Sequence, residues 1–366
     1  MPQSQNTLLN IRKALLAWYA VEARDLPWRR TSDPYATLVS EVMLQQTRVE
    51  TVLSYYAKFL ERFPTVEALA AAPIDDVLKT WEGLGYYRRA HHLHEAARAI
   101  VERYGGVIPE SIGDLKSLPG IGSYTAAAIA SIAFGLDEAV LDGNVIRVVS
   151  RLFAIGGDPQ RAATRSALRN AADRLLAPGR ASEFNQSMMD LGARICLPRS
   201  PRCGECPTAG ECDAHHVGEE TRYPERRPRK PIPHRDIVAG IIWDGEPNTA
   251  EARILISKRH ADDMLGGLWE FPGGHVEPGE TLEEALHREL REELDIEVDN
   301  LSFFLAVDHA YTHFRMTLHC FHCRHAGGTP KAVDVADLAW VSVKDLESYA
   351  FPVADQRILE RLQAMA

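Results

Sequence analysis

The pattern of hydrophobic and polar positions is helical along the first part of the chain. From Leu8 to Ala214, stretches such as residues 95–104 and 125–133 are rich in alanine and are punctuated by glycine and proline. The alternation of β-branched and polar residues that marks a half-buried strand is nearly absent there. We therefore predict an all-α domain at residues 1–217.

Alternation typical of strands occurs only in the last third of the chain. It is found at residues 237–243, 253–257, 301–307 and 316–321. These stretches surround one strongly helical segment at residues 281–294. We predict an α+β domain at residues 237–366, so that the whole chain is a multidomain protein.

Between these parts the composition changes to arginine, proline and lysine, including the run Arg226-Arg227-Pro228-Arg229-Lys230-Pro231. Such a composition favours an extended segment that does not pack. Residues 218–236 are therefore predicted to be a linker. A length of 366 residues agrees with two domains, because a single core of that size is unusual.

Charge and hydropathy restrict the class of protein. No run of eighteen apolar residues occurs, and residues 1–10 carry no signal pattern, so we expect a cytoplasmic monomer with no membrane contact. The net charge of -10 excludes a surface covered in positive charge, so nucleic-acid binding would depend on local arginine clusters. The candidate clusters are Arg29-Arg30, Arg88-Arg89, Arg147 with Arg151, and Arg194 with Arg199 and Arg202.

Four cysteines crowd into one short stretch with the spacing C-x6-C-x2-C-x5-C, namely Cys196, Cys203, Cys206 and Cys212. Only Cys203 and Cys206 form the close pair that is typical of a zinc knuckle, and the outer two stand off irregularly. Four thiolates in this pattern favour a 4Fe-4S cluster. Zinc and disulfides remain open as alternatives.

A Leu-Pro-Gly-Ile-Gly turn at residues 118–122 comes directly before Ser123 and an alanine-rich helix. This arrangement reads as a helix-hairpin-helix. Gly120 and Gly122 let the backbone approach a ligand, and the amides at the start of the next helix form an anion site for a DNA phosphate. The alternative is a plain helix connector whose glycines serve packing alone.

Several motifs together resemble one family. They are Leu26-Pro27-Trp28-Arg29, residues 40–47 (SEVMLQQT), residues 83–87 (GLGYY), the hairpin, Asp142-Gly143-Asn144-Val145 and the four cysteines. The chain resembles the endonuclease III-like DNA glycosylases, and among them the MutY family of adenine DNA glycosylases. The resemblance implies base excision repair, in which the N-glycosidic bond of adenine mispaired with 8-oxoguanine or guanine in double-stranded DNA is hydrolysed.

The resemblance places two carboxyl groups in the reaction. Breaking the bond needs a proton for the leaving base and a negative charge near the sugar as it becomes an oxocarbenium ion. Glu41 lies among apolar residues, where desolvation favours the protonated acid. Asp142, at the predicted start of a helix, would stay ionised by accepting amide hydrogen bonds. Taken alone, Glu41 could be a surface carboxylate and Asp142 an ordinary helix cap.

Tyr124 distinguishes two mechanisms within the superfamily. Relatives that also cleave the DNA backbone carry a lysine at this position, and that lysine forms a Schiff base with the sugar. A phenol cannot form this imine, so the resemblance implies hydrolysis only. We expect Tyr124 to form a hydrogen bond near Asp142 and Asn144 to orient the site, although a tyrosine of the core is the simpler alternative.

The resemblance also assigns contacts with the base and the DNA. The target base must leave the duplex, and Gln46 and Tyr86 match the positions that brace the resulting gap. Trp28, Arg29 and Gln186 match the lining of the adenine pocket. We expect Arg48 and Arg88 to contact DNA together with Gly120, Gly122 and Ser123.

Residues 274–296 match the Nudix box of nucleotide diphosphate hydrolases, except that Asp295 replaces the final glycine. Glu289, Glu292 and Glu293 would share one face of the helix, and Mg²⁺ would relieve their repulsion. A surface helix with ion pairs such as Arg288 with Glu292 is the alternative. Arg324 replaces a further metal carboxylate, which argues against hydrolysis of free nucleotides.

Recognition of the lesion is assigned to the predicted α+β domain. The triplet Tyr311-Thr312-His313 matches the loop that reads 8-oxoguanine in the family, and Asp355 replaces an asparagine that reads the base in the nucleotide hydrolases. Cys320 and Cys323 lie three residues apart on a predicted strand, so their thiols point to opposite faces and do not form a metal site.

Overall fold

The computed structural model describes residues 4–225, 231–247, 249, 251–311 and 313–365. It divides into two compact units. The first comprises Met1–Ala71 and His92–Arg229, and the second comprises Ala72–His91 and Lys230–Ala366. Among the described residues, no helix combines the length and the apolar character needed to cross a membrane.

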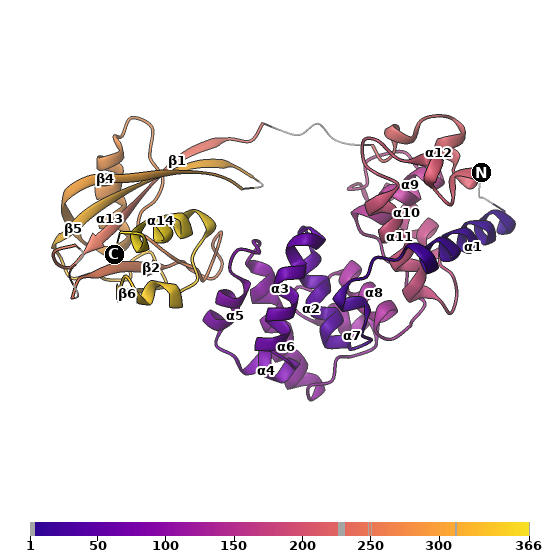
Figure 1. Ribbon diagram of the computed structural model, residues 1–366, viewed down its shortest axis with the longest axis horizontal. Coiled ribbons are helices and arrows are strands. Elements are labelled where there is room, and N and C mark those ends of the chain that lie inside the picture. Colours follow the sequence, from indigo (N-terminus) through magenta and orange to yellow (C-terminus); the bar gives the residue numbers. More distant parts are fainter. Residues whose placement is uncertain (1–3, 226–230, 248, 250, 312, 366) are drawn as a thin grey trace. The chain divides into compact units, whose positions relative to one another are not determined.

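Residues 4–225 are helical and contain no strand, as the sequence predicts (Figure 1). The α-helices are α1 (Gln5–Glu22), α2 (Pro34–Leu44), α3 (Val49–Arg62), α4 (Val66–Ala71), α5 (Ile74–Trp81), α6 (Arg88–Tyr104), α7 (Ile112–Ser117), α8 (Ser123–Ile132), α9 (Gly143–Leu152), α10 (Ala162–Leu175), α11 (Ala181–Arg194) and α12 (Asp213–His216). Short 3-10 turns are η1 (Pro27–Arg29), η2 (Cys203–Glu205), η3 (Ala209–Glu211) and η4 (Glu220–Arg222).

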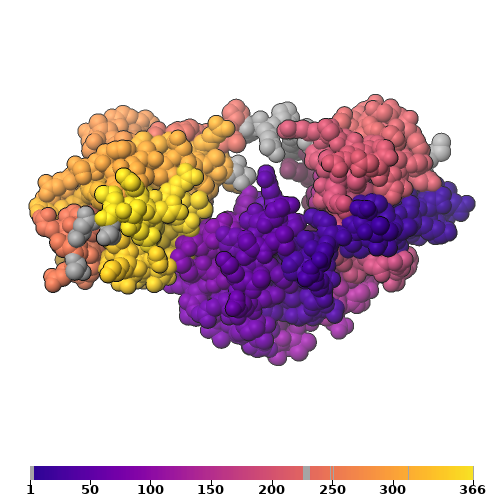
Figure 2. Space-filling model, in the orientation of Figure 1, coloured from indigo at the N-terminus to yellow at the C-terminus, as the bar shows by residue number. Residues whose placement is uncertain are grey.

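One core of the first unit joins α1, α8, α9, α10 and α11. Helix α1 starts at Ser4, whose hydroxyl accepts the Thr7 amide, and it buries Leu8, Ile11 and Leu15 at helical spacing against this core. Its other side stays on the surface, where α1 runs beside the segment around Glu211 (Figure 2). This core supports the start of α9, which carries one of the predicted site residues.

The second unit contains a six-stranded sheet of order β3-β2-β1-β5-β4, with β6 paired to β2. The strands are β1 (His234–Trp243), β2 (Arg253–Lys258), β3 (Trp269–Glu270), β4 (Glu297–Ala310), β5 (Arg315–Gly327) and β6 (Asp337–Ser342). The pair β1 and β5 is parallel, and the other pairs are antiparallel. The predicted α+β class is confirmed, while β3 and β6 were not predicted because they are short or weakly alternating.

Two helices cover the two faces of this sheet, α13 (Leu282–Leu294) and α14 (Val353–Gln363). Neighbouring strand residues contribute to opposite faces, so that Ile254 packs on the side of α14 and Leu255 on the side of α13. Cys320 and Cys323 separate in the same way, which confirms that their thiols do not converge. The turn η5 (Asp345–Ser348) precedes α14.

The predicted linker is shorter than its composition indicates. Turn η4 lies inside its first part, and the Tyr223 carbonyl accepts a hydrogen bond of 3.1 Å from Arg151 Nε. At the other end β1 begins at His234, which is in register with Arg315 of β5. Residues 226–230 lie outside the described residues. Composition alone does not reveal these ends, because their partners are distant in the sequence.

Candidate active site and associated sites

A cavity of about 140 Å³ lies within the first unit. Its lining comes from η1, α2, α8, α11 and the start of α9. It includes seven of the residues predicted for the site: Trp28, Arg29, Glu41, Tyr124, Asp142, Asn144 and Gln186. Glu41 and Asp142 therefore line one common space.

Glu41 is buried near the end of α2, with only 4% of its surface exposed. The start of helix α2 is stabilised by Asp33 as its N-cap and by Pro34 at its first position. Most residues of this helix are buried. Burial raises the pKa of Glu41 to about 7, helped by the charge of Asp142 and opposed by the Tyr124 hydrogen bond and by Arg29. Near neutral pH the side chain can therefore hold a proton and release it.

Asp142 caps α9, as predicted from the sequence. Its carboxylate accepts a hydrogen bond of 2.6 Å from the Val145 amide and one of 3.1 Å from Asn144 Nδ2. Burial raises the pKa of Asp142, and these two hydrogen bonds and the charge of Arg147 oppose the rise. The sequence predicts that amide hydrogen bonds keep Asp142 ionised. The bond from the Val145 amide is present, but burial of the carboxylate works against ionisation.

Tyr124 donates its hydrogen bond to Glu41. The hydroxyl lies 2.8 Å from Glu41 Oε2, and Asp142, near which the sequence predicts this hydrogen bond, also acts on the phenol through its charge. Helix α8 packs against α2, and this packing brings together two residues 83 positions apart. Burial and the neighbouring Glu41 raise the pKa of Tyr124 well above its usual value, so the phenol keeps its proton and acts as a donor.

Two lining residues, Arg29 and Gln186, are held by side chains that the sequence did not single out and that do not line the cavity themselves. Asp190 of α11 forms a two-bond pair with the Arg29 guanidinium, at 2.8 Å for each bond, and it also binds Arg24. The Tyr19 hydroxyl donates to Gln186 Oε1 at 3.3 Å. Asp190 lies four positions after Gln186 on the same helix, and this spacing is the signal that would have found it.

The residues expected to contact DNA do not line the cavity. Gln46 and Tyr86 are exposed and have positive φ angles of 56° and 50°, a conformation that is uncommon outside glycine and is often found at functional sites. Arg48 and Arg88 are also exposed, and each lies at the start of a helix.

The hairpin between α7 and α8 matches its predicted form. Gly120 has a φ of +70°, and a Cβ there would lie 2.4 Å from the Cβ of His92, so glycine is required. Gly122 caps α8 with no side-chain hydrogen bond, and a Cβ at Gly122 would meet nothing within 4 Å. With Ser123 exposed at the first helical position, the amides at this end are open to an anion.

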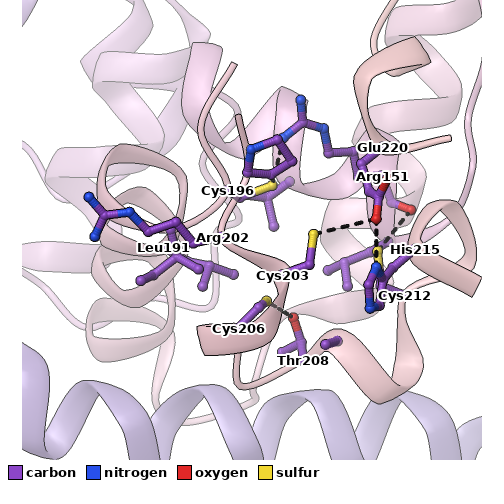
Figure 3. A pocket seen from close by; sticks show the side chains of 15 residues that line it. Arg151, Leu191, Cys196, Arg202, Cys203, Cys206, Thr208, Cys212, His215 and Glu220 are labelled. Atoms are coloured by element: carbon purple, nitrogen blue, oxygen red, sulfur yellow. Dashed lines mark hydrogen bonds and ion pairs between the residues drawn. The ribbon is translucent and has the colours of Figure 1, made fainter. Parts of the chain in front are cut away.

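The four cysteines of the predicted cluster line one small pocket, in which Figure 3 shows their sulfur atoms gathered around a common space. All four are free thiols, which excludes the disulfide alternative in this structure. Arg151 NH1 lies 3.2 Å from Cys196 Sγ, where it would offset the negative charge of a thiolate. Burial, followed by the nearby Glu220, raises the pKa of Cys203 to about 12, so this thiol needs a metal to become a thiolate.

A second metal-binding arrangement overlaps this pocket. Ligand atoms of Cys203, His215 and Glu220 lie within 4.8 Å of one another, a set that also suits zinc. The four-cysteine set nevertheless fits an iron–sulfur cluster better, because it supplies only thiols around one mainly apolar space.

Arg288 of the predicted Nudix box forms several ion pairs. It pairs with Glu280 at 2.7 Å and also contacts Glu289 and Glu292, so the pair named for the alternative of a charged surface helix is present. A Cβ at Gly274 would lie 2.4 Å from the Glu289 carboxyl carbon, which explains the glycine. Asp295, where the motif has glycine, adopts the left-handed conformation at the end of α13 and pairs with Lys331 at 2.7 Å.

Glu293 stands out among the carboxylates of α13. Its Oε2 atom is buried and has no hydrogen-bond partner among the described residues. Burial, together with the charges of Glu270 and Glu289, raises the pKa of Glu293 to about 8. Arg324 lies on β5 and pairs with Asp299 at 3.2 Å, so it supplies no carboxylate.

Two residues of the predicted lesion-reading triplet, Tyr311 and His313, lie between β4 and β5. Tyr311 packs its ring 5.1 Å from that of Phe314, His313 is exposed, and Thr312 lies outside the described residues. Asp355 is buried at the start of α14 and accepts the Phe271 amide at 3.2 Å. Burial raises the pKa of Asp355 to about 8, which makes a neutral carboxyl group accessible near neutral pH.

Two family models match the chain. Residues 39–173 match the HhH-GPD superfamily of base excision DNA repair proteins, and residues 240–361 match the NUDIX domain. The adenine DNA glycosylase of Homo sapiens is 34% identical, over 96% of this chain and 74% of that protein. The adenine DNA glycosylase of Schizosaccharomyces pombe is 32% identical, over 92% of this chain and 86% of that protein.

Solved structures agree with the helical fold. A thermostable thymine-DNA glycosylase aligns with a TM-score of 0.54 and 32% identity, over 58% of this chain and 98% of that chain. A non-covalent endonuclease III–DNA complex aligns with a TM-score of 0.51 over 59% of this chain and 98% of that chain; at 21% identity this likeness shows the fold alone.

Proposed function

Because the chain belongs to the adenine DNA glycosylase family, we propose that it binds duplex DNA and removes adenine mispaired with 8-oxoguanine or guanine. It is an enzyme that hydrolyses glycosyl bonds. The observation that carries the proposal is the shared cavity of Glu41 and Asp142, one with a proton to give and the other held by helix-cap hydrogen bonds.

In the proposed reaction the flipped adenine enters this cavity and Glu41 donates its proton to the base. The N-glycosidic bond then breaks, and its electron pair leaves with the base. Asp142 stabilises the positive charge that develops on the sugar. Water supplies the hydroxyl group that bonds to the sugar carbon, and its remaining proton returns to the Glu41 carboxylate. Tyr124 has no amine with which to form an imine, so the product is an abasic site in an uncut strand.

A single-turnover assay tests this function. Duplexes with one adenine opposite 8-oxoguanine, guanine or thymine would be incubated with excess protein, and strand cleavage would be measured before and after alkali. We expect abasic product opposite 8-oxoguanine and guanine but not opposite thymine, with strand breaks only after alkali. Tight binding without abasic product would instead show a damage sensor that lacks catalysis.

We propose that the triplet Tyr311-Thr312-His313 reads the 8-oxoguanine partner. The exposed His313 and the aromatic ring of Tyr311 support this role, since they offer a hydrogen-bonding group and a stacking surface at the end of two long strands. The assay above also tests this proposal, because equal rates opposite 8-oxoguanine and guanine would contradict it.

We propose that Cys196, Cys203, Cys206 and Cys212 hold a 4Fe-4S cluster, which would pin the loop that contains Arg199 and Arg202. Iron and acid-labile sulfide analysis of protein purified without added metal is expected to give about four of each per chain. Replacing Cys206 with serine should lower both contents together. Zinc in place of iron would contradict the cluster and would favour a zinc site, either on these cysteines or on Cys203, His215 and Glu220.

A second activity, Mg²⁺-dependent hydrolysis of an oxidised nucleoside triphosphate, is proposed for the second unit. The buried and unpartnered Glu293 Oε2 favours it, because a divalent cation would satisfy that oxygen and reduce the repulsion from Glu270 and Glu289. The proposal is independent of adenine removal, since its residues lie in the other unit.

Replacing Glu293 with glutamine is expected to lower Mg²⁺-dependent release of pyrophosphate from 8-oxo-dGTP by at least about tenfold, since one metal ligand is lost. Adenine release should be unchanged. The exposed Glu297, paired with Arg291, provides a matched control, and Glu297→Gln should retain turnover. If the wild-type protein gives no turnover with Mg²⁺, the second activity is refuted.

A further inference from the structure

Asp190 forms hydrogen bonds with two arginines that line the cavity, Arg29 and Arg24. Its side chain has no exposed surface, and both carboxylate oxygens accept hydrogen bonds from the Arg29 guanidinium. Arg24 makes three further contacts with the Asp190 carboxylate: its backbone amide lies 3.2 Å from Oδ2, and its Nε and NH2 atoms lie 2.8 Å and 2.6 Å from Oδ1. A planar, bidentate pair of this kind fixes the orientation of the guanidinium as well as its position.

The position of Arg29 makes this orientation important. Arg29 lines the same cavity as Glu41, and its positive charge favours the ionised form of Glu41. An uncompensated arginine beside the acid would therefore remove the proton that the reaction needs. The ion pair with Asp190 directs the guanidinium toward α11 and offsets its charge. Burial would raise the pKa of Asp190, but the hydrogen bonds and charges of Arg29 and Arg24 lower it, so Asp190 is ionised.

The groups that act on Glu41 are few. They are Tyr124 from α8, Asp142 from the start of α9 and Arg29 from η1. Helix α3, which also packs against α2, contributes none among the described residues. Arg29 is the only cation in this set. Arg24 also lines the cavity and shares Asp190 with Arg29, but only the charge of Arg29 acts on Glu41. The ionisation of Asp190 therefore determines how strongly Arg29 opposes protonation of Glu41.

We propose that Asp190 is a positioning residue of the active site: it holds the Arg29 guanidinium in the wall of the base pocket and cancels its charge beside Glu41. The inference rests on the acid role proposed for Glu41. It assigns Asp190 an effect on the reaction through Arg29, without contact with the base or the sugar.

The test is the pH dependence of single-turnover adenine release by the full-length protein. Protonated Glu41 is the active form, so the rate of the wild type should fall as pH rises through about 7. In Asp190→Asn the positive charge of Arg29 is no longer offset, so the pH at which the rate falls should be about one unit lower than in the wild type. The rate at about pH 8.5 should then drop about tenfold, while the rate at about pH 5.5 should change by less than about threefold. A uniform loss at every pH would show a purely structural role and would overturn the proposal.

Two further variants keep the test decisive. Asp173→Asn, on an exposed aspartate of α10 that pairs with Arg169, is the matched control and should leave the profile in place. If Asp190→Asn fails to fold because it leaves a buried charge unpaired, the double variant Arg29→Gln with Asp190→Asn removes both charges together. For this double variant, the pH at which the rate falls should equal that of the wild type or be higher. A shift of this pH to a lower value would refute the proposal.

These outcomes also separate this inference from the proposed function. If the wild type releases no adenine at any pH, the proposed function fails. If the wild type is active and the Asp190→Asn profile overlays it, only the role of Asp190 fails.

Discussion

Glu41→Gln is expected to abolish adenine release while leaving duplex binding intact. The amide keeps the size of the side chain and can still accept the Tyr124 hydrogen bond, but it has no acidic proton to give to the base. General acid catalysis usually contributes about 10²-fold to 10⁴-fold, and we expect a loss in that range. Single-turnover release and equilibrium binding, measured on the same duplex, separate the two effects.

The control for this change is Glu102→Gln, on an exposed glutamate of α6. It makes the same chemical substitution away from the cavity and should retain the rate of the wild type. The role assigned to Glu41 would be refuted by adenine release that proceeds at the normal rate in Glu41→Gln. A loss of binding that equals the loss of release would instead indicate that Glu41 holds the base.

Asp142→Asn is expected to lower adenine release by about 10²-fold to 10³-fold, because it removes the charge that stabilises the oxocarbenium ion. Asparagine is as good a helix cap as aspartate and can still accept the Val145 amide, so the thermal unfolding midpoint should stay close to that of the wild type. The rate of a single turnover and the unfolding midpoint are measured together.

A matched substitution exists at the start of α2. Asp33 caps that helix by accepting the Tyr35 amide, and it is exposed and lies outside the cavity lining. Asp33→Asn should therefore leave adenine release unchanged. If Asp142→Asn retains the rate, or if it loses rate only in proportion to lost stability, then Asp142 is a structural cap alone.

Local sequence was sufficient for much of the fold because the forces concerned are local. The capping box of α13, in which Thr281 and Glu284 exchange hydrogen bonds, follows from residues three positions apart. Asp142 at the start of α9 is a cap for the same reason. The opposite directions of Cys320 and Cys323 follow from the two-residue period of a strand.

The functional assignment depended more on the resemblance to a family than on the local pattern of residues. It selected Glu41, Asp142 and Gln186 from many similar side chains, and the structure places all three around one cavity. It did not identify the partners of these residues. A motif indicates which side chains react, but it does not indicate which side chains hold them in place.

The sequence by itself determined the helical half and the Nudix helix, because each depends on spacing along the chain, while the candidate reactive residues came from the resemblance to a family. The tertiary structure decided that Tyr124 bonds to Glu41 and that Asp190 holds Arg29, contacts between residues 83 and 161 positions apart. It also decided that burial raises the pKa of Glu41. Desolvation and long-range pairing depend on which elements pack together, and no local pattern of residues specifies that packing.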